Sequence, residues 1–209
     1  MKNSIKTLFA VALTAIVLTS ATTVKATEGH SNYTSITSVK NISKINISGN
    51  VKLILVQDAK ESVLVYDNYY TKNALVQQQN GELRISSFNK EPLTVIAHVN
   101  NISSIEASNN SSVSTSGNFN LLNLKVSLSD SATADINSNT VNLNTVVNNN
   151  ASLKLSGITD SYTAVLGTVA KVNMNDFSAA NTSVSTTQVP VYNASRYEDL
   201  KVDLLESLF

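Results

Sequence analysis

Apolar and polar residues alternate through the second half of the chain, in a pattern that returns every 19 positions from residue 105 onward. Alternation with a period of two predicts β-strands, because successive side chains of a strand point to opposite faces. Three successive repeats begin at Leu124, Leu143 and Tyr162. The predicted inward positions are Leu124, Val126, Leu128, Ala132, Ala134 and Ile136, then Leu143, Thr145, Val147, Ala151, Leu153 and Leu155, then Tyr162, Ala164, Leu166, Ala170, Val172 and Met174.

Short polar segments separate the two strands expected in each repeat: Ser129–Ser131, Asn148–Asn150 and Gly167–Val169. Asn, Asp and Gly tolerate left-handed backbone angles, which suits a sharp corner between strands. Strands and corners that return at a fixed period are typical of a protein built from stacked coils. We therefore predict an all-β fold, a single-stranded right-handed parallel β-helix with coils of about 19 residues, over residues 42–209.

The first half of this domain also alternates, with longer and less regular segments. Asn80-Gly81 is a strong signal for a tight turn between two strands. The strands expected here cover residues 45–47, 51–56, 62–66, 75–79, 83–86 and 93–99.

The N-terminus has the layout of a secretory signal peptide. Lys2 and Lys6 precede an apolar run over residues 8–18, and small and polar residues follow it. The run is too short to cross a bilayer, so we expect no stable membrane span after the signal is removed. Residues 1–26 are the predicted signal peptide, with cleavage after Ala21 or Ala26, and residues 27–41 a flexible N-terminus. The protein is then exported to the periplasm, the outer cell surface or the medium.

Charge and cysteine content narrow the range of partners. Removing Lys2, Lys6 and Lys25 leaves 12 basic residues against 15 acidic ones, a net charge near −3. This balance argues against nucleic acid as a partner. The chain has no cysteine, which excludes disulfides, thiolate metal sites and a lipid-anchored cysteine.

Residues suited to catalysis are sparse. His30 lies in the expected N-terminal extension, and His98 is expected to be a surface or edge residue of its strand. No Ser-His-Asp constellation, phosphate-binding loop or HExxH motif occurs, and Arg84 and Arg196 are far apart in sequence. We predict no catalytic, cofactor-binding or metal-binding residues, and no cofactor.

Asp135 and Lys154 occupy equivalent outward positions of adjacent repeats. The pair predicts an exposed ion pair between neighbouring strands. Calcium binding is the alternative, but the Gly-Gly-x-Gly-x-Asp pattern of calcium-binding β-rolls is absent.

One aromatic cluster lies within the segment Tyr66-Asp-Asn-Tyr-Tyr70. Exposed aromatic rings beside Asp and Asn can stack on sugar rings, so Tyr66, Tyr69 and Tyr70 are the candidate ligand-binding residues. The alternative is that these tyrosines pack a loop against the domain.

Four segments carry a resemblance to a known family: Ile45–Gln57, Glu61–Val65, Gly81–Ile85 and Pro92–Val99, followed by the Ser- and Asn-rich repeats. In this order they resemble the "putative auto-transporter adhesin, head GIN domain" family of Gram-negative bacteria, over roughly residues 42–195. The resemblance implies an exported, surface-associated protein, and its signature is a pattern of strands and turns without a catalytic motif.

Together these features predict a non-catalytic exported adhesin or glycan-contacting protein, with surface glycans or other envelope proteins as partners. Two other classes stay open: a polysaccharide-degrading β-helix enzyme and a purely structural envelope component.

The last segment, residues 195–209, can be read in two ways. Its leucines fit either a capped helix or the strand positions of a further repeat, and the match to the repeat favours the strand. A coil beginning at Leu200 would either cover the open end of the domain or allow end-to-end self-association through that end.

Overall fold

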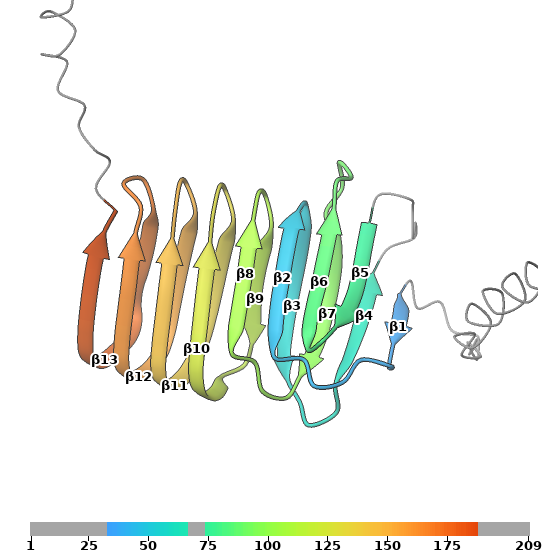
Figure 1. Ribbon diagram of the computed structural model, residues 1–209, viewed down its shortest axis with the longest axis horizontal. Helices are drawn as coiled ribbons and strands as arrows, with labels where there is room; N and C mark the ends of the chain where they lie inside the picture. Colours follow the sequence, from blue (N-terminus) through green and yellow to red (C-terminus); the bar gives the residue numbers. More distant parts are fainter. Residues whose placement is uncertain (1–32, 67–73, 188–209) are drawn as a thin grey trace, which may run out of the picture. The chain divides into compact units, whose positions relative to one another are not determined.

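The computed structural model describes residues 33–66 and 74–187, and all the regular structure within them is β-strand (Figure 1). The strands are β1 (Thr34–Ile36), β2 (Lys44–Gly49), β3 (Val51–Gln57), β4 (Ser62–Tyr66), β5 (Ala74–Gln79), β6 (Glu82–Ser87), β7 (Leu93–Val99), β8 (Ser104–Ser108), β9 (Ser112–Ser116), β10 (Phe119–Leu128), β11 (Thr133–Val147), β12 (Ser152–Leu166) and β13 (Lys171–Thr186).

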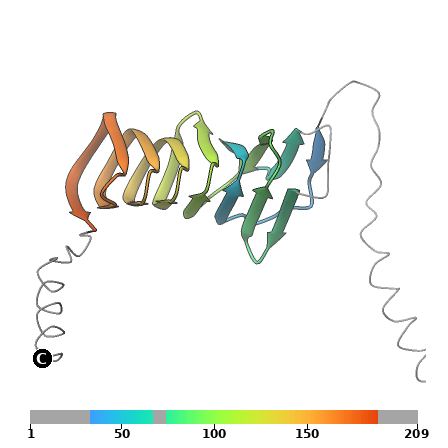
Figure 2. The same ribbon diagram turned by 90° about the horizontal axis from the view of Figure 1, so that it is seen from above.

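These strands form one sheet that curls over on itself as a half-barrel. The hydrogen-bonded order is β1-β4-β7-β3-β9-β11-β10-β8-β2-β6-β5, and β12 and β13 are added successively beside β11. The first part of β11 pairs with β9 and its second part with β10, so this strand passes from one layer of the curled sheet to the other. Figure 2 shows the bend that β10 to β13 share.

The prediction of a single-stranded right-handed parallel β-helix is wrong, although the all-β class is correct. The sheet is mixed: β1 with β4, β4 with β7, and β5 with β6 are antiparallel pairs. The prediction extended the parallel β-helix of the second half to the less regular strands of residues 42–104, where the described chain contains reversals of direction. Asn80 and Gly81 both have positive φ and close the β5–β6 hairpin, and residues 58–61 return the chain from β3 to β4.

The 19-residue spacing of the second half of the chain corresponds to the register between neighbouring parallel strands. Leu124 lies opposite Leu143, and Leu143 lies opposite Tyr162. Between β12 and β13 the register shifts after Lys154, so that Ser156 lies opposite Asp176. The regular 19-residue spacing therefore ends inside β13, after Asn173.

The core fills the space inside the curled sheet, and the inward positions predicted for β10 to β12 are confirmed. All of them are buried except Leu166, which is half-buried. Met174 on β13, which was predicted to be buried, is 39% exposed. The difference arises because β13 has a neighbour only on its β12 side among the described residues, so its side chains are covered from one side.

The structure has the left-handed backbone predicted at two corners and the predicted ion pair. Asp130 and Asn149 have φ of 60° and 57°, the left-handed region expected at these corners. The Asp130 carboxylate accepts hydrogen bonds from the Asn109 amide and from Asn149 Nδ2, which joins three adjacent corners. The predicted ion pair is also confirmed, with Lys154 Nζ at 3.1 Å from Asp135 Oδ2.

Several predictions concern parts of the chain outside the described residues. These are the signal peptide over residues 1–26, Tyr69 and Tyr70, and the coil or helix over residues 195–209. Within the expected N-terminal extension, Thr34–Ile36 forms β1 and Val39 is buried. No helix in the described part of the chain has the length and apolarity of a membrane span.

Candidate functional site

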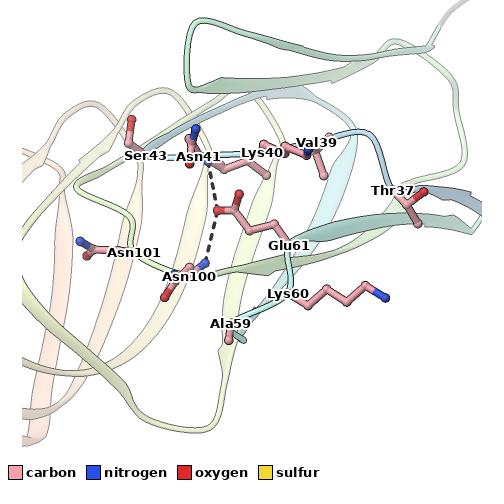
Figure 3. Close-up of a pocket in the computed structure, with 11 residues that line it drawn as sticks. Thr37, Val39, Lys40, Asn41, Ser43, Ala59, Lys60, Glu61, Asn100 and Asn101 are labelled. Atoms are coloured by element: carbon pink, nitrogen blue, oxygen red, sulfur yellow. Dashed lines mark hydrogen bonds between the residues drawn. The ribbon is translucent and has the colours of Figure 1, made fainter. Parts of the chain in front are cut away.

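A polar pocket of about 550 Å³ opens where three connecting segments meet (Figure 3). The segments are the chain before β2, the loop between β3 and β4, and the loop after β7. The polar side chains that line the pocket include Thr37, Asn41, Ser43, Glu61, Asn100 and Asn101. Pockets of this volume are typical of sites for small molecules.

The Glu61 carboxylate lies at the centre of this pocket. Its Oε1 accepts hydrogen bonds from the backbone amides of Ile42, at 3.1 Å, and Asn100, at 3.5 Å. Through these two hydrogen bonds, one carboxylate oxygen of the β3–β4 loop connects that loop to the other two segments. Its second oxygen, Oε2, makes no hydrogen bond with any residue that the structure describes. Figure 3 shows the carboxylate between Asn41 and Asn100.

Buried side chains hold the segment before β2, which forms one wall of the pocket. Val39 and Ile42 are 5% and 1% exposed, so both anchor this segment to the core. Asn41 between them is exposed, and its φ of 56° allows the chain to turn there. Ile102 holds the loop after β7 in the same way, with 1% exposure. The pocket is therefore formed by anchored backbone.

The pocket carries charged groups of both signs. Lys40 and Lys60 also line it and are exposed, and Glu61 is the only carboxylate among the described residues that line it. No group of three or more His, Cys, Asp or Glu side chains that could hold a metal ion occurs in the described residues. The groups that are present can donate and accept hydrogen bonds to a ligand.

Tyr66, one of the three predicted ligand-binding residues, ends β4 and is 38% exposed. Its ring lies 5.2 Å from that of Tyr33, with the two planes tilted by 42°. Tyr33 was not among the predicted ligand-binding residues, because it lies in residues 27–41, the segment predicted to be a flexible N-terminus. The pairing of β1 with β4, in which Thr34 lies opposite Val65, brings the two tyrosines together.

A second pocket, of about 620 Å³, follows the bend of β10 to β13. Leu122, Val141 and Ile158 line it and are 71%, 41% and 58% exposed. Two pairs of amide side chains run beside them: Asn139 Nδ2 donates to Asn120 Oδ1, and Asn142 Nδ2 donates to Asn123 Oδ1. We call this second pocket, with its exposed Leu122, Val141 and Ile158, the apolar groove. The alternation of apolar residues did not predict it, because alternation places the large apolar side chains of these strands in the core.

His98 lies at the surface, as predicted. Its Nδ1 is 3.4 Å from Asp58 Oδ2, and its side chain is 27% exposed. The pKa of Asp58 is lowered mainly by the Lys60 amide, which donates a hydrogen bond to Oδ1 at 3.0 Å, and His98 adds to this effect. Arg84 is also exposed and pairs with Glu82 at 2.8 Å. Neither residue lines the Glu61 pocket.

Most of the described chain matches one protein family model. Residues 41–189 match the family model described as "Putative auto-transporter adhesin, head GIN domain". No curated protein matches the chain.

Several solved structures share the fold at low sequence identity. A "putative adhesin" from Bacteroides fragilis superimposes with a TM-score of 0.60 at 17% identity, covering 75% of this chain and 76% of that one. A "putative lipid binding protein" from Parabacteroides distasonis gives a TM-score of 0.57 at 11% identity, covering 76% and 80%. A "putative adhesin" from Parabacteroides merdae gives 0.54 at 12% identity, covering 74% and 76%.

Proposed function

Because the chain belongs to the family described as "Putative auto-transporter adhesin, head GIN domain", we propose that it is an exported, non-catalytic protein of the cell surface or periplasm that binds glycans. The observation that carries the glycan part of this proposal is the exposed Tyr33–Tyr66 pair. Tyrosine rings offer an apolar face and a polar hydroxyl, which suits the apolar faces and hydroxyl groups of sugars. The signal-peptide layout of residues 1–26 supports export.

A row of polar side chains extends from the tyrosine pair across the sheet. Tyr66 lies opposite Thr94, Thr94 opposite Lys52, and Lys52 opposite Ser112. Ser112 in turn lies opposite Thr133. Directly opposite residues share one face of a sheet, so these groups form a line of hydrogen-bonding positions about 4.8 Å apart. An extended glycan could contact the aromatic pair and this row together.

The absence of catalysis in this proposal is supported by the composition of the polar pocket. Most glycoside hydrolases use two carboxylates that flank the scissile bond. Of the described residues that line this pocket, only Glu61 is acidic, and its Oε1 already accepts hydrogen bonds from two amides. A polysaccharide-degrading enzyme would need a second acid or base, which none of the described residues provides at this pocket.

A glycan array tests the proposed function directly. We expect the exported protein to retain glycans without releasing products, and Tyr66→Ala and Tyr33→Ala each to weaken binding by about three- to tenfold. Phe88→Ala is the matched control, because Phe88 is an exposed aromatic residue (75%) outside the tyrosine pair. Equal losses in all three variants would argue against the tyrosine site, and new reducing ends or unsaturated sugars would establish the enzyme alternative.

The apolar groove favours a second candidate function, the binding of an acyl chain. Leu122, Val141 and Ile158 expose large apolar surfaces in one groove, which water disfavours. One protein of similar fold, from Parabacteroides distasonis, carries the name "putative lipid binding protein".

A fluorescent fatty acid tests this second candidate. Replacing either Leu122 or Ile158 by Asn should weaken its binding by about threefold or more, since each change removes apolar contact area. Val169→Asn is the control, because Val169 is 62% exposed and does not line the groove. Binding that is absent, or that all three variants retain, would leave glycan binding as the better-supported function.

A further inference from the structure

We infer that the Glu61 pocket is a separate subsite that holds one neutral sugar residue. The inference rests on the proposed glycan-binding function for its ligand class, but it rests on a different set of side chains from the tyrosine pair. The pocket's volume of about 550 Å³ is sufficient for a small polar ligand.

The hydrogen-bonding groups of the pocket are available to a ligand. Glu61 Oε2 is a free acceptor, while Oε1 is held by the amides of Ile42 and Asn100. The side-chain amides of Asn41, Asn100 and Asn101 make no hydrogen bond with any other residue in the described part of the chain. Each amide offers both donors and an acceptor, and a sugar hydroxyl can use either.

The pocket carries charges of both signs, so a charged ligand of either sign would meet at least one like charge there. An anionic ligand would meet the free oxygen of Glu61 at the centre of the pocket, and like charges repel. A cationic ligand would meet Lys40 and Lys60, which carry two positive charges at the same pocket. No aromatic side chain of the described residues lines the pocket, so these residues provide no stacking surface for a nucleobase. A neutral polyhydroxylated ring satisfies these groups without placing like charges together.

The β1–β4 pair connects this pocket to the tyrosine pair. Tyr33 and Tyr66 lie at one end of the pair, and Thr37 and Glu61, which line the pocket, flank its other end. Four residues of extended chain separate Tyr33 from Thr37, which corresponds to about 13 Å. A single oligosaccharide can therefore occupy the pocket with one residue and contact the tyrosines with another.

The variant Glu61→Gln separates binding from folding. Its side-chain carbonyl oxygen can still accept the hydrogen bonds from Ile42 and Asn100, while an amide donor replaces the acceptor that faces the pocket. Glu106→Gln is the matched control, because Glu106 is exposed on β8 and lies outside this pocket. Asn101→Ala serves as a second variant, since Asn101 is exposed and its loss removes one pocket amide without disturbing the Glu61 contacts.

The experiment measures binding of four trisaccharides to the exported protein by ligand-observed NMR. The neutral probes are maltotriose, mannotriose and chitotriose, and the acidic probe is trigalacturonate. We expect at least one neutral probe to bind, with about tenfold weaker affinity in Glu61→Gln, a smaller loss in Asn101→Ala, and no change in Glu106→Gln.

Three results would overturn the subsite: no neutral probe binds, trigalacturonate binds best, or both pocket variants bind as well as the unmodified protein. If binding survives in both pocket variants and is lost in Tyr66→Ala, the glycan function stands and the pocket is excluded. If the protein binds none of the four probes and nothing on the glycan array, both proposals fail together.

Discussion

Tyr162 shows how a single buried polar group is accommodated in the core. The residue is 2% exposed, and its hydroxyl forms a hydrogen bond of 3.0 Å with Thr145 Oγ1 on the neighbouring strand. Its ring also packs edge-on against Phe177, at 5.2 Å between centroids. The sequence predicted that Tyr162 and Thr145 point inward, because both occupy apolar positions of the alternation. It could not predict their hydrogen bond, which depends on how the two side chains pack.

Burial raises the pKa of Tyr162, although the hydrogen bond from Thr145 opposes part of this effect. The folded state therefore holds the phenol proton more tightly than the unfolded state. The resulting stability is fully present below pH about 10, the unfolded value, and is lost as the pH rises through the folded pKa. We expect the free energy of unfolding in urea to fall above pH about 10, and less steeply in Tyr162→Phe. Parallel pH profiles for the two proteins would contradict this assignment.

At the scale of elements, two close backbone approaches require glycine. Gly157 in β12 has φ of 101°, and an added Cβ would overlap the carbonyl oxygen of Ser138 on β11. Gly49, at the end of β2, stands in the same relation to Ser87 of β6. Gly117 also has a positive φ, 82°, but an added Cβ would meet nothing within 4 Å.

This difference gives a matched pair of substitutions. Gly157→Ala should destabilise the protein by about 3 kcal/mol or more, because it adds a steric overlap with neighbouring backbone to the left-handed strain. Gly117→Ala should cost only the strain, about 1–2 kcal/mol. Chemical denaturation measures both values. Equal losses would show that strand β12 can shift away from β11 at this point.

The positions of the strands could be predicted from the sequence. The pairing of the strands could be predicted only in the second half of the chain, where the spacing is regular. Alternation located β2, β3, β4, β6 and β7 to within a few residues, since each has one buried face. Matching positions also predicted the ion pair between Asp135 and Lys154, because β11 and β12 are sequential parallel neighbours. The antiparallel pairing of β4 with β7 leaves no periodic signal, and for this reason the fold was assigned as a β-helix. The antiparallel pairing of β1 with β4, which brings Tyr33 to Tyr66, leaves no such signal either.

The polar pocket could not be found from sequence for a related reason. Its residues come from three connecting segments that are brought together only by the order of strands in the sheet. Glu61 looked like an ordinary loop carboxylate. Its role becomes visible only when Ile42 and Asn100, which are 19 and 39 residues away, donate to the same oxygen.

For the molecule as a whole, the outer edge of β13 is a long strand edge without a partner among the described residues. Among the described residues this strand pairs only with β12, and it exposes Met174 and Val184 at 39% and 50%. Long edge strands without proline and with few charges invite pairing with another chain. We propose that end-to-end self-association, expected from the sequence at the C-terminal end, uses this edge.

Sedimentation at increasing protein concentration tests this proposal. The double variant Met174→Lys/Val184→Lys should reduce self-association, because two charges would then have to be buried at the contact. Ser183→Lys is the control, since Ser183 is an exposed neighbour of Val184 on the same strand. A protein that remains monomeric at all concentrations, or a control that acts as strongly as the double variant, would exclude this edge.

The placement of β2 and β3 determines the order in which this protein can fold. β2 lies between β6 and β8, and β3 lies between β7 and β9. These two early strands therefore need partner strands that extend as far along the chain as Ser116. Lys44 and Ser104, which are opposite each other, are 60 residues apart in the chain. Closing such long loops is slow. A chain that crosses a membrane N-terminus first would therefore emerge with β2 and β3 unpaired. Strands β10 to β13 would add to the sheet one after another once β2 and β3 had paired with β6 to β9.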